Sequence, residues 1–144
     1  MKVFIENEAG KAIKNIHNEK TLEFKKSYKL KLAYPYPYGF ILNTTSGDGD
    51  NLDCFVLTAQ KLKTGQTVDC EPIALMKQVE NGDEDYNVID VLKGESAKLT
   101  LEVKDKLTQF ILHVFDHWEW VKDMRVEGFD SKEVAVKYIQ SCKD

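Results

Sequence analysis

Short apolar stretches bounded by turn residues fill the first two thirds of the chain and predict a β-rich region. Strands are expected at residues 3–5, 40–42, 52–58 and 86–92. The stretch LDCFVLT at 52–58 combines aromatic and branched residues, which suit a half-buried sheet surface. Residues 67–77 predict two short strands or one bent strand, because Pro72 interrupts the pattern at an edge or a bulge.

The stretches between these strands are more polar. Residues 7–20 contain Gly10 and few apolar positions, so they are expected to form turns. Residues 21–32 alternate in part and are rich in lysine, which favours a strand pair with one face in water. Residues 43–50 predict a loop. The dipeptide Asn81-Gly82 is typical of hairpin turns, but its acidic flanks argue against a hairpin there.

The periodicity becomes helical after Gly94. A first helix is expected from about Lys104, and its apolar positions are 107, 110, 111, 114, 115 and 118. A second begins near Ser131 as N-cap. Its expected inward residues are Val134, Ala135, Tyr138 and Ile139. No repeat or linker divides the chain, so residues 1–144 are expected to form one α+β domain, mainly β, with two C-terminal helices on a small barrel or twisted sheet.

Composition narrows the class of protein. Hydrophobic residues make up 42% of the 144 residues, enough for one globular core. The net charge of −4 argues against a nucleic-acid surface, and no apolar run is long enough for a signal peptide or a membrane span. Three cysteines without a C-x-x-C pair suggest reduced thiols, so a cytoplasmic location is expected.

A group of carboxylates provides the clearest candidate chemistry. Asp48, Asp50 and Asp53 form the pattern D-G-D-x-x-D, and such closely spaced acids repel one another unless a cation lies between them. Hard cations such as Mg²⁺ prefer oxygen ligands. A second acidic stretch, 80–85, supplies enough further oxygens for two or more Mg²⁺ or Mn²⁺ ions if the fold joins the two, although alone it suits an exposed acidic turn better.

Other sites fit the sequence less well. An EF-hand fails because Leu52 and Asp53 stand where the calcium loop needs an oxygen ligand and a glycine. His113 and His117 are four residues apart on the expected helix, but without a His-Glu-x-x-His motif they suit a helix surface better than zinc. Cys54 lies within an apolar strand, where thiols are usually inert.

The stretch YPYPYGFILNTTSGDGDNLDCFVL resembles the signature of the soluble family I inorganic pyrophosphatases. Its centre is Tyr-Gly-aromatic-Ile, followed by a polar loop and Asp-Gly-Asp-x-apolar-Asp. The block CEPIALMKQVENGDEDYNVIDV and the later HVFDH and VEGF segments are also similar to the family, so the resemblance covers nearly the whole chain. It implies a five-stranded, OB-like barrel with two flanking helices.

The resemblance also implies roles for individual residues. The metal ligands would be Glu6, Asp48, Asp50, Asp53, Glu80 and Asp85. Asp50 is at the position of the general base, and Tyr38 is also assigned to catalysis. The substrate-binding residues would be Lys14, Lys25, Lys26, Tyr34 and Tyr38, with Lys25 or Lys26 in place of the family arginine. Lysine keeps that charge but loses the bidentate fork.

Three further positions depart from the family pattern. Asn87 replaces a lysine, and Trp118 and Glu119 replace a Tyr-Lys pair. Each lost cation removes charge-assisted contacts to a phosphate-bearing substrate. The metal-binding part of the expected site is therefore nearly complete, whereas its phosphate-binding part is depleted.

The resemblance implies Mg²⁺-dependent hydrolysis of inorganic pyrophosphate to two orthophosphates, with several Mg²⁺ ions per site and Mn²⁺ able to substitute. Two alternatives stay open: hydrolysis of another phosphoanhydride, such as a nucleotide or a small phosphorylated compound, and a catalytically weakened homologue that binds metal or a partner. The expected partners are pyrophosphate and further copies of the chain in a homo-oligomer, with neither nucleic acid nor membrane.

Overall fold

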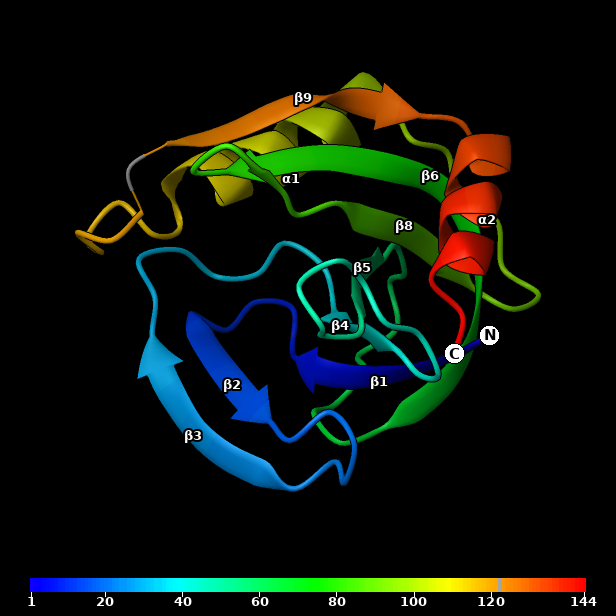
Figure 1. The fold of residues 1–144 in the computed structure, drawn as a ribbon, viewed down its shortest axis with the longest axis horizontal. Coiled ribbons are helices and arrows are strands. Elements are labelled where there is room, and N and C mark those ends of the chain that lie inside the picture. The colour runs from blue at the N-terminus through cyan, green and yellow to red at the C-terminus, as the bar shows by residue number, and fades with distance from the viewer. Residues whose placement is uncertain (122) are drawn as a thin grey trace.

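The computed structural model describes residues 1–121 and 123–144, which form a curved β structure with two helices packed on it (Figure 1). The strands are β1 (Lys2–Asn7), β2 (Ile13–His17), β3 (Phe24–Lys29), β4 (Tyr38–Ile41), β5 (Leu52–Val56), β6 (Thr67–Glu80), β7 (Asp83–Glu84), β8 (Asn87–Leu92) and β9 (Met124–Asp130). The helices are α1 (Leu101–His113) and α2 (Lys132–Ser141).

Five strands close into a barrel in the order β1-β4-β5-β8-β6, because β6 also pairs with β1. The β5–β8 pair is parallel and the other pairs are antiparallel. Strands β7 and β9 extend the sheet from β6. The expected five-stranded barrel with two helices is confirmed.

Strands β2 and β3 form a separate two-stranded ribbon that curves around the outside of the barrel (Figure 1). The prediction of turns throughout residues 7–20 was wrong, because Ile13–His17 is a strand. The predicted strand pair within 21–32 is a single strand whose partner is β2, and every residue of it is exposed. The ribbon covers little of the core, so its side chains are mostly polar and give no clear hydrophobic pattern in the sequence.

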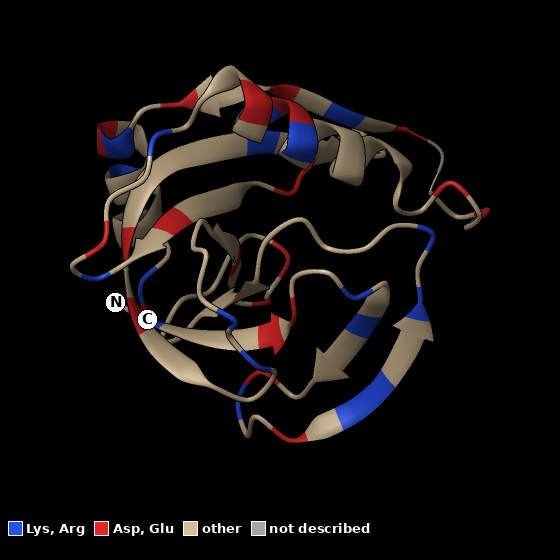
Figure 2. Cartoon of the chain, turned by 180° about the vertical axis from the view of Figure 1, so that it is seen from behind, with Lys and Arg blue, Asp and Glu red and all other residues tan. Residues whose placement is uncertain are grey.

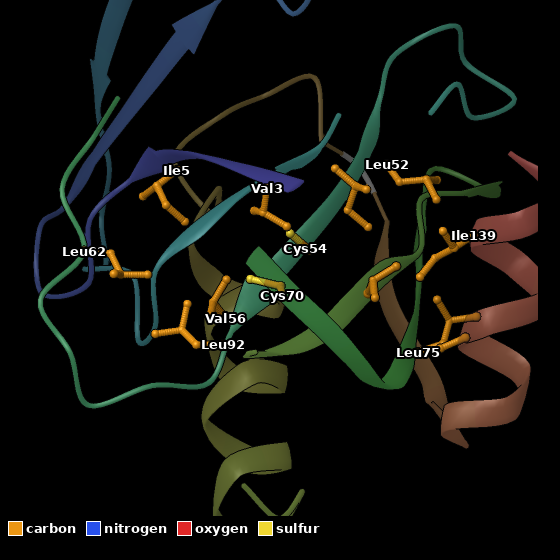
Figure 3. Packing of buried hydrophobic residues seen from close by; sticks show 13 residues of the cluster. Val3, Ile5, Leu52, Cys54, Val56, Leu62, Cys70, Leu75, Leu92 and Ile139 are labelled. Atoms are coloured by element: carbon orange, nitrogen blue, oxygen red, sulfur yellow. The ribbon is translucent and has the colours of Figure 1, made fainter. Parts of the chain in front are cut away.

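Two clusters of buried side chains make up the core. One lies between β1, β4, β5, β6 and α2, and Figure 3 shows Ile139 projecting from α2 toward the sheet, with the sulfurs of Cys54 and Cys70 in the middle. The other lies between the barrel and α1, whose buried residues include Leu107 and Phe110. Each helix thus covers a different part of the barrel.

The first helix is shifted from its predicted position. Thr100 caps its N-terminus by accepting a hydrogen bond from the Val103 amide, and the helix ends at His113. Phe115, His117 and Trp118 therefore lie beyond it. The prediction that His117 shares a helix with His113 was wrong, since helical spacing continued past the end of the helix.

The second helix begins as predicted, with Ser131 as its N-cap. Ala135 and Ile139 are buried as expected, but Val134 is 42% exposed. Strand β9, which precedes this helix and pairs with β6, was not predicted from the sequence.

Strand β6 is continuous through its bulge next to Pro72, which agrees with the bent-strand alternative. It then turns at Asn81-Gly82, both with positive φ, and returns as β7. The acidic flanks did not prevent this hairpin, so the dipeptide was wrongly discounted. Within the described residues, neither helix is both long and apolar enough to cross a membrane.

Candidate active site

The loop before β5 holds two of the three signature aspartates. Asp48 accepts hydrogen bonds from the Ser46 hydroxyl and, at 2.9 Å, from the Asp50 amide, which closes a tight turn around Gly49. Gly49 has a φ of +88°, a conformation that glycine adopts without steric cost. Asp48 and Asp50 are exposed here, whereas Asp53 is on β5 and only partly exposed.

Glu6 lies at the end of β1, where the barrel meets the β2–β3 ribbon. Its Oε2 accepts a 2.9 Å hydrogen bond from the His17 amide and lies 3.1 Å from His17 Nδ1. Burial raises the Glu6 pKa to about 7, with Asp50 adding to the rise while the His17 amide and Lys14 oppose it. Glu6 is therefore a desolvated carboxyl that faces the signature loop.

Asp85 follows β7, and the Gln78 side chain donates a 3.1 Å hydrogen bond to it. Burial raises its pKa to about 6, with contributions from Glu80, Asp48 and Asp50. The pKa of Asp53 is also raised, by burial first and then by Asp85. The fold thus brings the two acidic stretches of the sequence close enough to influence each other's ionisation.

Two adjoining clefts contain most of these acids, with Asn51 and Asp53 lining both. The first cleft has a volume of about 410 Å³ and is lined by Ser46, Gly47, Asp48, Asn51, Leu52, Asp53, Asp83, Glu84, Asp85, Tyr86 and Tyr138. The second cleft has a volume of about 470 Å³ and is lined by Glu6, Lys14, Ile16, His17, Asn18, Glu19, Lys20, Lys25, Tyr38, Gly49, Asp50, Asn51 and Asp53. Glu80 lines neither, although its own pKa is raised by burial and by Asp83.

The two candidate tyrosines differ in position. Tyr38 lines the second cleft, and its pKa is raised by burial and then by Asp53. Tyr34 is buried, its ring centre lies 4.7 Å from that of Phe110 at a tilt of 41°, and its hydroxyl accepts a 3.2 Å hydrogen bond from Asn7. Tyr38 is thus placed to reach a ligand, whereas Tyr34 supports it from the core at a ring distance of 5.3 Å.

The three candidate lysines are on the β2–β3 ribbon, where Figure 2 shows basic segments on both strands. Lys14 and Lys25 line the second cleft, and the charge of Lys25 opposes the rise in the Asp50 pKa. The Lys26 ammonium instead lies 5.2 Å from the centre of the Tyr28 ring. The ribbon therefore supplies cations along one side of the acidic loop.

Glu19 lies in the same cleft and was not among the residues picked from the sequence. Its Oε1 accepts a 2.8 Å hydrogen bond from the Asn51 amide, within the signature loop. Burial raises its pKa to about 7, and Asp50, Glu6 and Asp48 raise it further. No motif marks Glu19, because only the fold of the ribbon brings it to the loop.

The chemistry of this donor set fits hard cations. The carboxylates are oxygen donors whose pKa values are raised by burial and by one another, so a bound cation would relieve their repulsion. In the described part of the chain, no three His, Cys, Asp or Glu side chains are already gathered as a ready-made metal site.

A model of the inorganic pyrophosphatase family matches residues 3–144. Curated relatives named inorganic pyrophosphatase include those of Buchnera aphidicola (33% identity; 77% of this chain and 69% of the relative) and Escherichia coli K12 (32%; 72% and 64%). The chain belongs to the inorganic pyrophosphatase family. A pyrophosphatase of Nanoarchaeum equitans is 28% identical over 98% of this chain and 94% of its own length. The chain thus spans about two thirds of the bacterial relatives and nearly all of the archaeal one.

Solved pyrophosphatase structures have the same fold. The protein from Neisseria gonorrhoeae superposes with a TM-score of 0.84 at 29% identity, over 99% of this chain and 88% of that one. The protein from Thermus thermophilus superposes with a TM-score of 0.89 at 23% identity, over 99% and 88%. Nearly every element of this chain therefore has a counterpart in the pyrophosphatase fold.

The residues that depart from the family pattern have different surroundings in this chain. Asn87 is buried on β8, and its side chain donates a hydrogen bond to Gln78, which in turn holds Asp85. Trp118 and Glu119 lie in the segment between α1 and β9, outside both clefts. Asn87 thus supports the residue that holds a carboxylate, whereas Trp118 packs against Phe115 and Trp120.

Proposed function

We propose that this protein hydrolyses inorganic pyrophosphate to two orthophosphates in a Mg²⁺-dependent reaction. The observation that carries the proposal is the pair of acidic clefts that meet at Asp53 in a chain of the pyrophosphatase family. Glu6, Asp48, Asp50 and Asp85 complete the oxygen donors around that residue.

These carboxylates would hold Mg²⁺, with Mn²⁺ as a substitute, and Glu80 would add charge from outside the clefts. Metal bound here would supply a water of lowered pKa, and hence hydroxide near neutral pH. Asp50 is exposed at the second cleft and accepts the proton from the attacking water. The raised pKa of Asp50, caused by burial and by Asp48, suits a proton acceptor.

The ribbon and the barrel share the task of holding phosphate oxygens. Lys14 and Lys25 lie in the cleft with Tyr38, so they are the groups best placed to contact an anion. Lys26 contributes its positive charge from the surface of the ribbon, and Tyr34 supports the ring of Tyr38 from the core. We assign Lys25 to the place of the family arginine, because Lys25 lines the cleft and Lys26 does not.

The test is orthophosphate release from pyrophosphate with Mg²⁺, compared for the native protein, Asp50→Asn and Asp105→Asn. Asp105 is an exposed residue of α1, so its variant is the matched control for a charge change. Asp50→Asn should lose at least about a hundredfold in rate, as typical of a lost proton acceptor. Turnover at background in the native protein and in both variants would overturn the proposal.

Calorimetry separates an enzyme from a weakened homologue. Mg²⁺ binding that Asp53→Asn abolishes, together with turnover, supports the proposal, whereas Mg²⁺ binding without turnover favours a metal-binding descendant.

We also propose that residues 1–144 act as one domain in the cytoplasm, in a homo-oligomer. The three cysteines are free in the structure, and sedimentation would give the number of copies.

A further inference from the structure

Beside the ribbon, four aromatic residues form a surface that we call the aromatic shelf: Tyr28, Phe115, Trp118 and Trp120. Phe115 stacks on Trp118 with ring centres 4.5 Å apart, and Trp120 lies 5.3 Å from Trp118 at 37°. Tyr28 and Trp118 meet edge to face with ring centres 5.7 Å apart, which joins the shelf to β3. The three rings beyond α1 are thus within 40° of parallel.

The shelf is open to solvent. Trp120 is 57% exposed and Tyr28 is 39% exposed. Exposed tryptophan is costly to leave in water, and aromatic rings prefer offset-stacked or edge contacts with other rings. An outer ring such as Trp120 therefore offers a face on which another planar ring can stack.

Lys14 connects the shelf to the acidic clefts. Its ammonium lies 5.0 Å from the centre of Phe115 and 5.9 Å from that of Trp118, within the range of a cation–π contact. The same side chain lines the second cleft, and its charge opposes the rise in the pKa values of Glu6 and Asp85. One cation thus faces both the aromatic rings and the site proposed for phosphates.

A ligand that uses both surfaces needs a planar ring at one end and a phosphoanhydride at the other. Because aromatic side chains stack on any nucleobase, and stacking depends little on base identity, the shelf fits a base without selecting one. We propose that the protein also binds and hydrolyses nucleoside diphosphates, with the base on the aromatic shelf and the phosphates beside Lys14. This inference rests on the proposed pyrophosphatase site, whose chemistry it uses.

The added reaction is the same hydrolysis on a different leaving group. The oxygen of water attacks the terminal phosphorus, and the bond from that phosphorus to the bridging oxygen breaks. The bridging oxygen leaves with the nucleoside monophosphate, and Asp50 takes the proton of the attacking water. The products are one nucleoside monophosphate and one orthophosphate, with no change in oxidation state.

Binding can be measured without turnover, because Trp118 and Trp120 are the two tryptophans of the chain and both belong to the shelf. Tryptophan fluorescence is recorded with Mg²⁺ while adenosine 5′-(α,β-methylene)diphosphate is added, and again with methylenediphosphonate, which lacks the nucleoside. Quenching by the nucleotide analogue alone is expected, since only its base reaches the shelf. Equal responses to both ligands would overturn the proposal.

Substitutions then test which surface binds the base. Trp120→Ala should weaken binding of the nucleotide analogue roughly tenfold and lower the rate on adenosine diphosphate relative to that on pyrophosphate by the same factor. Trp120→Phe should restore most of the loss, because a planar ring remains. Leu101→Ala, which changes a 75% exposed apolar residue elsewhere, serves as the control and should change neither.

The outcomes separate the two proposals. Pyrophosphate hydrolysis without nucleotide binding or turnover would overturn this inference and leave the proposed function intact. Loss of both activities in the native protein would overturn the proposed function, and fluorescence would still report whether the base binds. Fluorescence that depends on protein concentration but not on nucleotide would show that the shelf is a contact between copies, which also overturns the inference.

Discussion

The Asn51 amide donates a 2.8 Å hydrogen bond to Oε1 of Glu19, a residue 32 positions earlier in the chain. This contact ties the end of the β2–β3 ribbon to the loop that carries Asp48 and Asp50. Glu19 also raises the pKa of Asp53 by its charge. The ribbon therefore contributes a carboxylate to the acidic site as well as its lysines.

Glu19→Gln should lower the affinity for Mg²⁺ roughly tenfold, because the amide keeps a hydrogen-bond acceptor for Asn51 but removes a negative charge near Asp50. Glu19→Ala should lower the affinity for Mg²⁺ further, because the loop also loses the hydrogen bond from the Asn51 amide. Mg²⁺ titrations by calorimetry and by pyrophosphate hydrolysis measure the effect. Glu23→Gln is the matched control, because Glu23 is exposed on the same ribbon; an equal effect there would contradict the prediction.

Lys25 and Lys26 are adjacent, yet their substitutions should differ. Lys25→Ala removes a cation from the cleft and should lower kcat/KM for pyrophosphate about 10- to 100-fold, as expected for one charge-assisted contact. Lys26→Ala removes a charge held over Tyr28 and should have a smaller effect. Steady-state kinetics of both variants at fixed ionic strength decide the order, and a larger loss at Lys26 would refute the assignment.

Gly39→Ala should destabilise the barrel where β4 pairs with β1. A Cβ at Gly39 would lie 1.9 Å from the Phe4 carbonyl oxygen, so the two strands must separate. The expected loss in the free energy of unfolding is about 3 kcal/mol, the upper end for overpacking. Gly47→Ala is the control, because a Cβ there meets no atom within 4 Å, and should stay within about 0.5 kcal/mol. Urea unfolding measures both, and equal midpoints would contradict the strand-contact argument.

Asp90 should make stability fall as pH rises. Asp90 is fully buried, and burial raises its pKa to about 8 from an ordinary value of 3.8. Between about pH 4 and pH 8 the unfolded chain loses this proton while the folded chain keeps it, so the stabilising contribution declines across that range. Asp90→Asn mimics the protonated acid and should remove this decline.

The measurement is urea unfolding of the native protein and Asp90→Asn at pH 5 and pH 8. Between pH 5 and pH 8, the free energy of unfolding of Asp90→Asn should rise by at least about 1.4 kcal/mol relative to that of the native protein. This amount corresponds to one pKa unit. Asp105→Asn, an exposed substitution on α1, should show no such gain. Identical pH dependence in the native protein and Asp90→Asn would refute the role of Asp90.

The barrel strands were predictable because their burial leaves a pattern. Most of the buried residues in 52–58 and 86–92 are apolar, with Asn87 and Asp90 as exceptions, and β5 and β8 lie within these ranges. The β2 strand and β9 were missed because intermediate or exposed side chains dominate both, so periodicity gives no signal. The first helix was predicted to continue too far because Phe115 and Trp118 keep its apolar spacing beyond His113.

The sequence by itself determined the family, the barrel and the acidic signature, because Asp48, Asp50 and Asp53 are close along the chain and need no fold to be recognised. The tertiary structure alone decided which distant groups face them. Glu19 reaches the loop and Lys14 reaches the aromatic shelf because the ribbon curves around the barrel. Side-chain contacts between distant segments depend on strand pairing and curvature, and neither is written in local sequence.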